Sequence, residues 1–370
     1  MSSPNAKTIP CKRIFDPADP AYDESIRRFQ GCPTIAVTRG GRIFLGWYAG
    51  GLCEPHMDNY SLLIYSDDGG KTWSKPVFVI PSDKENLIHA LDIQLRTAPD
   101  GSLQVYWTQN NVEPDDGREI VPVYGKPVVS RYGYIFNDME HAEWRMICRD
   151  PDAETLVFDE TECLDKGFLR CKPLVLHDGT QINFNYDQTV DRYGYSISKD
   201  GGRTFTHAYG ARKIKTNFDE TMAYEMRDGT IRMFARSWIG ELVESLSFDG
   251  GNTWTDARPS GITAPDTRFY VSRLSSGRVL LIASDAPKIR SRLTAYLSED
   301  DGANWKYKKL IDPRDNISYP DADEHDGRIF LTYDRDRMGE KEILFTSFTE
   351  ADIMDGDFAC DIGIVSKPAP

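Results

Sequence analysis

A short unit recurs six times along this 370-residue chain, and this repetition limits the possible folds more than any other feature. Each copy has an alternating apolar segment, a glycine turn and a second apolar segment. The turn glycines are Gly41, Gly101, Gly179, Gly229, Gly277 and Gly327. Gly-Gly or Asp-Gly between β-rich runs predicts a tight hairpin, because glycine accepts the positive φ that such a turn needs. The sequence therefore predicts six hairpins spread over the whole chain.

A second motif follows four of the six hairpins and combines aspartate, glycine and an aromatic residue. Its copies are SDDGGKTW (66–73), SKDGGRTF (198–205), SFDGGNTW (247–254) and SEDDGANW (298–305). In such a turn the aspartate can bond the backbone of its own turn, and the aromatic ring anchors the turn on the sheet. We therefore expect the aspartates to be structural and not catalytic. They are Asp67, Asp200, Asp249 and Asp300.

The length of the repeat predicts the architecture. A unit of about 50 residues with two hairpins holds four strands, the content of one propeller blade. Six units closed into a ring leave no exposed sheet edge. The sequence thus predicts an all-β fold, a six-bladed β-propeller of four-stranded antiparallel blades, as a single domain over residues 1–370. The second spacing between turn glycines is 78 residues, against 48 to 60 for the others, which predicts an insertion at about 110–170.

Charge and composition narrow the partners. A formal net charge of −14 disfavours nucleic acid and an anionic membrane surface. No apolar run approaches the roughly 18 residues of a membrane span, and no secretory signal is visible, so we expect a cytoplasmic protein, or a secreted one if a signal has been removed. The seven cysteines form no C-x-x-C pair and the six histidines no H-x-x-x-H pair. We therefore expect neither a metal nor another cofactor, and the oligomeric state stays open.

Because the strands of a blade are antiparallel, the position of a residue in the sequence predicts at which end of the blade it lies. In each blade the start of strand one, the end of strand two and the start of strand three lie at one end, opposite the aspartate turns. Residues there converge around one mouth of the central axis. Seven to ten residues before the turn glycines stand Gly31, Asp92, Lys172, Glu220, Arg268 and Tyr319. The ends of the second strands and the loops after them add Glu54, Asp58, Arg236 and Arg290. One charged strand end alone is commonly just solvated, so it is the convergence of several that indicates a ligand-binding site.

Over nearly its full length the chain resembles the sialidase superfamily, in its broad bacterial branch, whose Asp boxes (BNR repeats) match the four aspartate turns. DETMAYEMRDGTIRMFAR resembles the segment with the glutamate that activates the nucleophile and an arginine of the carboxylate-binding triad, here Glu220 and Arg236. RSRLTAYLSEDDGANW resembles the segment of another triad arginine, Arg290, with Arg292 as its rival. SYPDADEHDGRIFLTYD resembles the segment of the catalytic tyrosine, Tyr319.

Two positions depart from the family pattern. Counting back from the first Asp box, the family's acid/base aspartate falls on Glu54, which is one methylene longer. The Arg-Ile-Pro motif that supplies the first triad arginine is replaced by GCP, with Gly31 in place of the arginine. The run YDRDR ends the second strand of the sixth unit, so Arg335 or Arg337 could take the place of the missing arginine.

The resemblance implies an exo-acting, retaining glycoside hydrolase that releases a terminal sialic acid or a related acidic sugar from a glycan. Arg236 and Arg290 would hold the sugar carboxylate. Tyr319 would attack the anomeric carbon with Glu220 as its base, and Glu54 would protonate the leaving oxygen and later activate water. A phenol suits this substrate because the sugar's own carboxylate would repel a carboxylate nucleophile.

Asp92 and Arg268 stand at the same mouth, and we expect both to contact the substrate. Two alternatives remain open. One is a polysaccharide lyase, or a hydrolase of another sugar, on the same propeller; in the lyase Tyr319 acts as base and acid, and His89 or an arginine neutralises a uronate. An unsaturated product that absorbs in the ultraviolet would identify the lyase. The other is a non-catalytic glycan-binding propeller, in which Tyr319→Phe keeps the ligand affinity and no turnover occurs.

Overall fold

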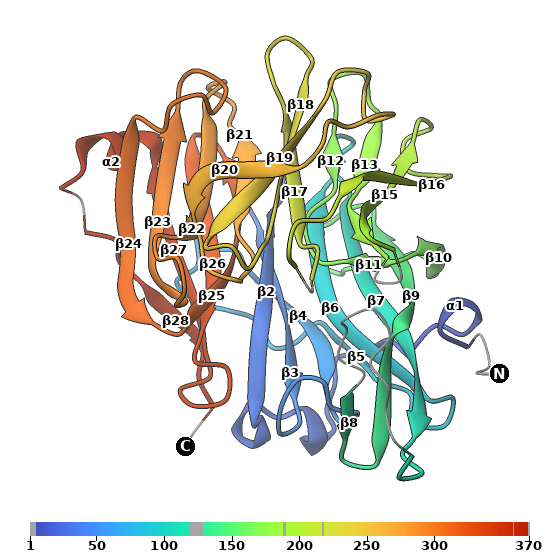
Figure 1. Ribbon diagram of the computed structural model, residues 1–370. Coiled ribbons are helices and arrows are strands. Elements are labelled where there is room, and N and C mark those ends of the chain that lie inside the picture. The colour runs from blue at the N-terminus through green and yellow to red at the C-terminus, as the bar shows by residue number, and fades with distance from the viewer. Residues whose placement is uncertain (1–4, 119–128, 188–189, 217, 358, 369–370) are drawn as a thin grey trace.

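The structure, a computed structural model, describes residues 5–118, 129–187, 190–216, 218–357 and 359–368. Its strands form six blades around a central axis (Figure 1), each built on four antiparallel strands, and the described residues add one separate two-stranded sheet. This confirms the predicted all-β, six-bladed propeller. Across the described residues, no helix has the length and apolar character that crossing a bilayer requires.

Each blade runs from an inner first strand to an outer fourth strand. The first strands are β2 (Phe29–Val37), β6 (Ile88–Thr97), β12 (Leu174–Val175), β17 (Thr221–Glu225), β21 (Tyr270–Arg273) and β25 (Ile317–His325). The second strands are β3 (Ile43–Gly50), β7 (Leu103–Pro114), β13 (Gln181–Asn183), β18 (Ile231–Ala235), β22 (Val279–Ser284) and β26 (Arg328–Arg335).

The outer strands complete the six sheets. The third strands are β4 (Tyr60–Ser66), β9 (Tyr134–Cys148), β15 (Arg192–Ser198), β19 (Glu241–Ser247), β23 (Ser291–Ser298) and β27 (Glu342–Thr349). The fourth strands are β5 (Phe78–Pro81), β10 (Glu162–Lys166), β16 (Thr206–Arg212), β20 (Arg258–Thr263), β24 (Tyr307–Asp315) and β28 (Gly363–Ser366). The additional elements are α1 (Asn5–Thr8), β1 (Ile14–Phe15), the 3-10 turns η1 (Pro20–Tyr22) and η2 (Glu24–Ile26), β8 (Val129–Arg131), β11 (Phe168–Leu169), β14 (Asn185–Tyr186) and α2 (Glu350–Asp355).

The ring closes where the first blade meets the last. Strand β2 is buried along its whole length and packs against β25 and β26 of blade six as well as β6 of blade two. In the described part of the chain, no sheet mixes strands from the two chain ends. Closure therefore rests on face-to-face packing, supported by hydrogen bonds such as that from Ser366 Oγ to Gln30 Oε1 at 3.1 Å.

The Asp boxes join the third and fourth strands, as expected, and their aspartates bond their own turns. Asp200 Oδ1 accepts the backbone N–H of Thr204 at 2.9 Å, and its Oδ2 accepts the Thr204 hydroxyl at 2.6 Å. In the first box the structural residue is Asp68, which makes the equivalent bonds to Thr72 at 2.9 and 2.7 Å. The prediction of Asp67 was wrong by one residue, because two aspartates are adjacent there; Asp67 instead pairs with Arg42 at 2.6 Å.

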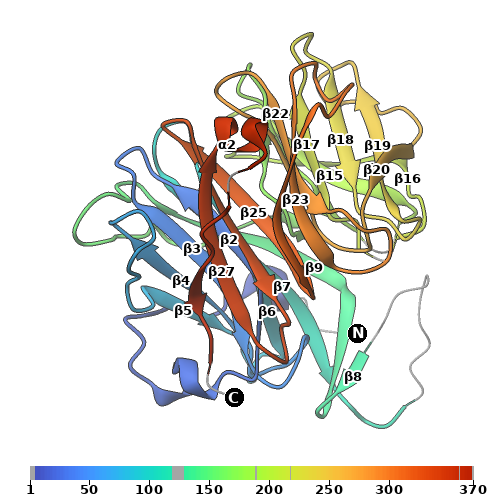
Figure 2. The ribbon, with the colours of Figure 1, turned by 90° about the vertical axis from the view of Figure 1, so that its left-hand side faces the viewer.

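Blade two carries an extended hairpin. Strands β7 and β9 stay paired as far as Pro114 and Tyr134, and β8 adds to the outer edge of β9. In Figure 2 β8 lies at one end of the molecule and α2, which follows the third strand of blade six, lies at the other. The hairpin therefore projects from the end opposite the Asp boxes. It lies within the predicted insertion at 110–170, of which residues 119–128 are outside the described residues.

Candidate active site at the mouth of the ring

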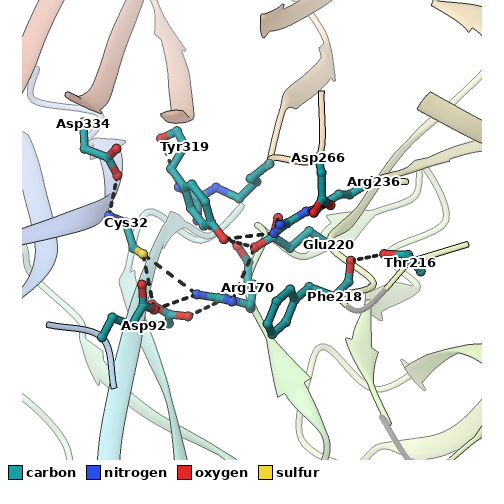
Figure 3. A network of polar contacts seen from close by, with 12 residues as sticks. Cys32, Asp92, Arg170, Thr216, Phe218, Glu220, Arg236, Asp266, Tyr319 and Asp334 are labelled. Atoms are coloured by element: carbon teal, nitrogen blue, oxygen red, sulfur yellow. Dashed lines mark hydrogen bonds and ion pairs between the residues drawn. The ribbon is translucent and has the colours of Figure 1, made fainter. Parts of the chain in front are cut away.

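Three first strands carry the same distortion at the mouth. Cys32, Asp92 and Tyr319 have φ values of 57°, 45° and 55°, and each stands where the strand register shifts by a β-bulge. Positive φ is uncommon outside glycine, and a bulge re-aims the side chain it carries. Figure 3 shows these three side chains facing the guanidinium of Arg170. The bulges thus turn side chains of blades one, two and six into one site.

A buried tyrosine and a buried glutamate form the centre of this site. The Tyr319 hydroxyl donates a short hydrogen bond to Glu220 Oε1. Arg236 Nη1 binds Glu220 Oε2 at 2.9 Å and the Tyr319 hydroxyl oxygen at 3.3 Å. The structure therefore brings together three residues that the sequence predicts to meet, from blades four and six.

Burial and charge set the protonation of this pair. Burial raises the pKa of Tyr319. Burial also disfavours an ionised Glu220, but the cations Arg236 and Arg170 and the hydrogen bond from Tyr319 outweigh it and lower the pKa of Glu220 to about 2. At neutral pH the site therefore holds a neutral phenol bonded to a carboxylate, which is the arrangement in which a base can take the proton of a nucleophile.

Five guanidinium groups lie around the side chain of Tyr319, those of Arg170, Arg236, Arg268, Arg290 and Arg337. The Cζ atoms of Arg337 and Arg290 lie 4.0 and 5.8 Å from the centroid of the Tyr319 ring, and Arg236 contacts its hydroxyl. Burial and the charges of Arg337 and Arg236 lower the pKa of Arg290. Within the described ranges Arg290 takes part in no ion pair, and its Nη2 donates to the backbone oxygen of Asp266 at 3.0 Å. The cluster therefore has uncompensated positive charge that an anionic ligand would neutralise.

Arg292, the rival of Arg290, lies outside this cluster. Its side chain is 53% exposed, and its nearest carboxylate is that of Asp285 at 3.9 Å. Asp58, another residue expected at the mouth, pairs with Lys84 at 2.5 Å on the surface. Neither of them joins the other predicted site residues.

Arg337 fills the space that Gly31 leaves open. A Cβ atom on Gly31 would lie 2.7 Å from Nε and 2.8 Å from Cδ of Arg337, so any larger residue would displace this side chain. Asp334 holds the guanidinium through Nε at 3.0 Å. Arg335 is directed elsewhere, to Glu342 at 3.0 Å. Blade six thus places an arginine side chain in the space beside Gly31 of blade one.

Glu54 lies in the loop between β3 and β4 and is held by two arginines. Its carboxylate oxygens lie 3.0 Å from Arg337 Nη1 and 3.2 Å from Arg170 Nη2. Burial raises the pKa of Glu54, but Arg337 and Arg170 outweigh burial and lower it. The carboxyl is therefore ionised at neutral pH, and it must lose the influence of one arginine before it can donate a proton.

Arg170 links the carboxylates of the site, although the sequence did not predict it there. It pairs with Asp92 at 2.5 Å, with Glu54 at 3.2 Å and with Glu220 at 3.5 Å, and its side chain is only 5% exposed. Lys172, the residue predicted at the entrance of blade three, instead binds the backbone oxygens of two other blades inside the ring.

A constant offset would have found Arg170. Counted back from its turn glycine, each entrance residue in five blades stands nine positions away. These residues are Cys32, Asp92, Arg170, Glu220 and Arg268, and Tyr319 stands eight positions away in the sixth blade. The offset is hard to recognise in blade three because the inner strand of this blade is broken. Strand β11 pairs with β14, and β12 begins only at Leu174.

Arg268 and Asp92 are buried and contact other residues of the site. Arg268 donates to the backbone oxygens of Arg170 at 2.8 Å, Pro33 at 2.6 Å and Tyr319 at 3.3 Å, and it is 2% exposed. Asp92 is 1% exposed and bound to Arg170. This geometry favours supporting roles for both residues, in place of the expected contacts with substrate.

One group of side chains has the composition of a metal site. Single ligand atoms of Cys32, Glu54 and Asp92 lie within 4.8 Å of one another. The guanidinium of Arg170 already pairs with both carboxylates. Because a cationic side chain neutralises these carboxylates, the group does not fit a metal ion well.

Two repeat families match the sequence. The BNR repeat-like domain matches residues 153–331, and the BNR/Asp-box repeat matches residues 64–75. The first match contains the second, third and fourth Asp boxes in full, and the second match contains the whole of the first box. The families therefore cover the same four turns that the structure places between third and fourth strands.

Known proteins with similar sequences or folds include sialidases. The anhydrosialidase of Macrobdella decora is 27% identical over 170 residues, which is 40% of this chain and 22% of that protein. The sialidase of Bacteroides fragilis (strain YCH46) is 28% identical over 162 residues, 40% of this chain and 29% of that protein. The matches thus span less than a third of either relative. The intramolecular trans-sialidase of Ruminococcus gnavus, solved with oseltamivir carboxylate, superposes with a TM-score of 0.67 at 16% identity over 90% of this chain and 97% of that one, which shows a shared fold.

Proposed function

The chain belongs to the sialidase-like family of Asp-box (BNR) proteins, and from this premise we propose that it is a retaining exo-glycosidase that removes a terminal sialic acid or a related acidic sugar from glycans. The main support is the buried Tyr319–Glu220 pair beside converging arginines, Arg236, Arg290 and Arg337 among them. A phenol nucleophile suits an anomeric carbon that carries a carboxylate, and sialidases with a tyrosine nucleophile use it. The arginines supply the matching positive charge.

The first half of the proposed reaction forms a bond between Tyr319 and the sugar. Glu220 takes the hydroxyl proton as the phenolic oxygen attacks the anomeric carbon. The bond to the leaving group breaks, and the leaving oxygen takes a proton from Glu54. Arg236 and Arg170, next to the hydroxyl and the ring, stabilise the negative charge that develops on the phenol.

The second half releases the sugar. Glu54, now ionised, takes a proton from a water molecule, which attacks the anomeric carbon on the face that the leaving group has vacated. The bond to Tyr319 breaks, and the phenolic oxygen recovers its proton from Glu220. Two displacements at one carbon retain the configuration.

The acidity of Glu54 depends on the substrate in this scheme. In the free site, Arg337 lies 3.0 Å from Glu54 and keeps the carboxyl ionised. An anionic sugar shares the charge of Arg337, weakens its attraction to Glu54 and so raises the pKa of the carboxyl toward the range of a general acid. A neutral sugar lacks this effect, which favours acidic sugars at the chemical step as well as in binding.

The lyase alternative finds no support in the surroundings of His89. This residue is 1% exposed, and its ring nitrogens bond the Tyr48 hydroxyl at 2.5 Å and Asn110 at 3.0 Å. Burial lowers the pKa of His89 to about 4, so the ring is neutral at pH 7. A neutral, packed histidine cannot neutralise a uronate.

Turnover on a panel of aryl glycosides tests the proposal. The panel contains sialic acid, related ulosonic acids, uronic acids and neutral deoxy sugars. We expect turnover confined to acidic sugars and lost in Tyr319→Phe. Tyr195→Phe, a matched change at a buried tyrosine that packs on Trp254 of the third Asp box, should keep the wild-type rate. Full activity of Tyr319→Phe, or an unsaturated product, would contradict the proposed mechanism.

A further inference from the structure

The tip of the blade-two hairpin is attached to the loop that carries Glu54. Arg131, the last residue of β8, donates from Nη1 to the backbone oxygen of Glu54 at 2.6 Å and contacts Cys53 Sγ at 3.3 Å. The hairpin belongs to blade two and the loop to blade one. An element outside the regular blade thus lies directly beside the candidate acid/base residue.

The turn at this tip presents an aromatic side chain in an unfavourable backbone conformation. Arg131 and Tyr134 pair across the turn, and the two residues between them, Tyr132 and Gly133, have φ values of 51° and 83°. Hairpin turns of this kind favour asparagine, aspartate or glycine at both positions. A bulky residue at positive φ is a genuine outlier, and such strain is found at ligand-binding sites. The identity of Tyr132 is therefore not explained by the needs of the turn.

The ring of Tyr132 is supported on one side and open on the other. It packs on the ring of His56, with 4.7 Å between the centroids, and Tyr132 is still 59% exposed. Burial lowers the pKa of His56, so the supporting ring is neutral at pH 7. His56 follows Glu54 by two residues, and Leu52, 51% exposed, precedes it by two. Exposed apolar surface therefore lies on both sides of Glu54 along its loop.

The proposed reaction determines which part of the substrate contacts this surface. Glu54 gives its proton to the leaving oxygen, so the leaving group lies on the side of Glu54 away from Tyr319. We propose that Tyr132, with Leu52, forms the subsite for the leaving group, and that its occupant is the pyranose ring of the sugar next to the cleaved bond. The C–H face of a pyranose is apolar and packs on an aromatic ring, whereas its hydroxyls stay in water. This inference rests on the proposed function.

Two substrates that differ only in the leaving group test the subsite. One is an oligosaccharide with the terminal acidic sugar; the other is the methyl glycoside of the same sugar, whose leaving group is a single methoxy group that needs the same proton from Glu54. Tyr132→Asn removes the ring, and asparagine tolerates the left-handed turn. We expect kcat/KM on the oligosaccharide to fall roughly tenfold, the effect of one aromatic contact, and kcat/KM on the methyl glycoside to stay unchanged.

Two further variants define the result. Tyr132→Phe keeps the ring and should keep the wild-type rate on both substrates. Phe248→Asn removes an aromatic residue that is 71% exposed in the third Asp box, at the opposite end of the ring, and should also change neither rate.

The outcomes separate the subsite from the reaction. An equal loss on both substrates in Tyr132→Asn would mean that the hairpin only positions Glu54, and no loss on either would mean that the ring is not used; each result overturns the subsite. Failure of the wild-type protein to hydrolyse the aryl or methyl glycoside of any acidic sugar would overturn the proposed function itself.

Discussion

The two ends of this propeller use carboxylates in different ways. In the Asp boxes, Asp200 is half-buried and its counterparts are exposed, and the hydrogen bonds that hold each carboxylate come from its own turn. At the mouth, Glu220, Asp92 and Glu54 come from three blades and are held by arginines from other strands. The boxes are local devices repeated along the chain, whereas the mouth is one charged network that exists only when the ring is closed.

This difference predicts how far a change spreads. The pKa of an Asp-box aspartate is lowered mainly by the hydroxyl and backbone N–H of its own turn. At the mouth, Arg170 alone contacts three carboxylates. A substitution in a box should therefore act on one turn, while a substitution at the mouth should alter the charge state of several groups.

Removing the carboxylate of Glu220 should have the largest effect. Glu220→Gln abolishes the base that takes the proton of Tyr319, so we expect kcat to fall by about 10²- to 10⁴-fold. Asp200→Asn, which neutralises an Asp-box carboxylate, should leave kcat unchanged. Steady-state kinetics on the acidic aryl glycoside measure both. Equal losses in the two variants would end the distinction between the two ends of the ring.

Removing Arg170 should destabilise the protein strongly. Arg170→Met leaves Asp92, Glu54 and Glu220 with fewer cationic partners in a buried site, and breaking a buried pair in this way typically costs about 3–5 kcal/mol. Lys306→Met breaks an exposed pair with Glu299 at 3.0 Å beside the fourth Asp box, and exposed pairs contribute about 0–1 kcal/mol. Urea unfolding gives both free energies. A difference below the error of the two measurements would contradict the network.

Lowering the pH should destabilise the charged network at the mouth before it destabilises the turns of the Asp boxes. The folded-state pKa of Glu220 is about 2, below its ordinary value of 4.5. A depressed pKa stabilises the folded state above the unfolded value, and this stability is lost as the pH falls from about 4.5 toward 2; the shift corresponds to about 3 kcal/mol. Unfolding free energies of wild type and Glu220→Gln over this range should converge as the pH falls. Parallel curves would contradict the assigned charge state.

The fold was predictable because its signals are local. The turn glycines and the Asp boxes act within a few residues, and their repetition gives the blade number directly. The positions of Tyr319, Glu220 and Arg236 followed from strand order and family resemblance. The resemblance also identified Glu54 and the gap at Gly31.

The rest of the site depends on distortions that the sequence pattern does not display. The bulges that aim Cys32 and Asp92 add no turn residue to the sequence, and the broken inner strand of blade three hid Arg170. Arg337 could be placed in the site only with the structure, because the distance between Arg337 and Gly31 depends on how blades six and one pack. Contacts between blades are thus the part of the site that could be predicted least well from the sequence.

Arg337 offers the finest test, because its expected effect is a shift in a pH profile. In the free protein Arg337, together with Arg170, lowers the pKa of Glu54 below its ordinary value. Arg337→Met removes one of these two charges, so the pKa of Glu54 should rise. A general acid is active below its pKa, so the basic limb of kcat/KM should move to higher pH, although kcat/KM at the optimum falls because the sugar carboxylate loses a partner. Arg335→Met, a change two residues away at an arginine paired with Glu342, is the matched control and should leave the limb in place. A basic limb that stays fixed in Arg337→Met would show that Arg337 does not control Glu54, and the mouth would then consist of independent pairs, as the boxes do.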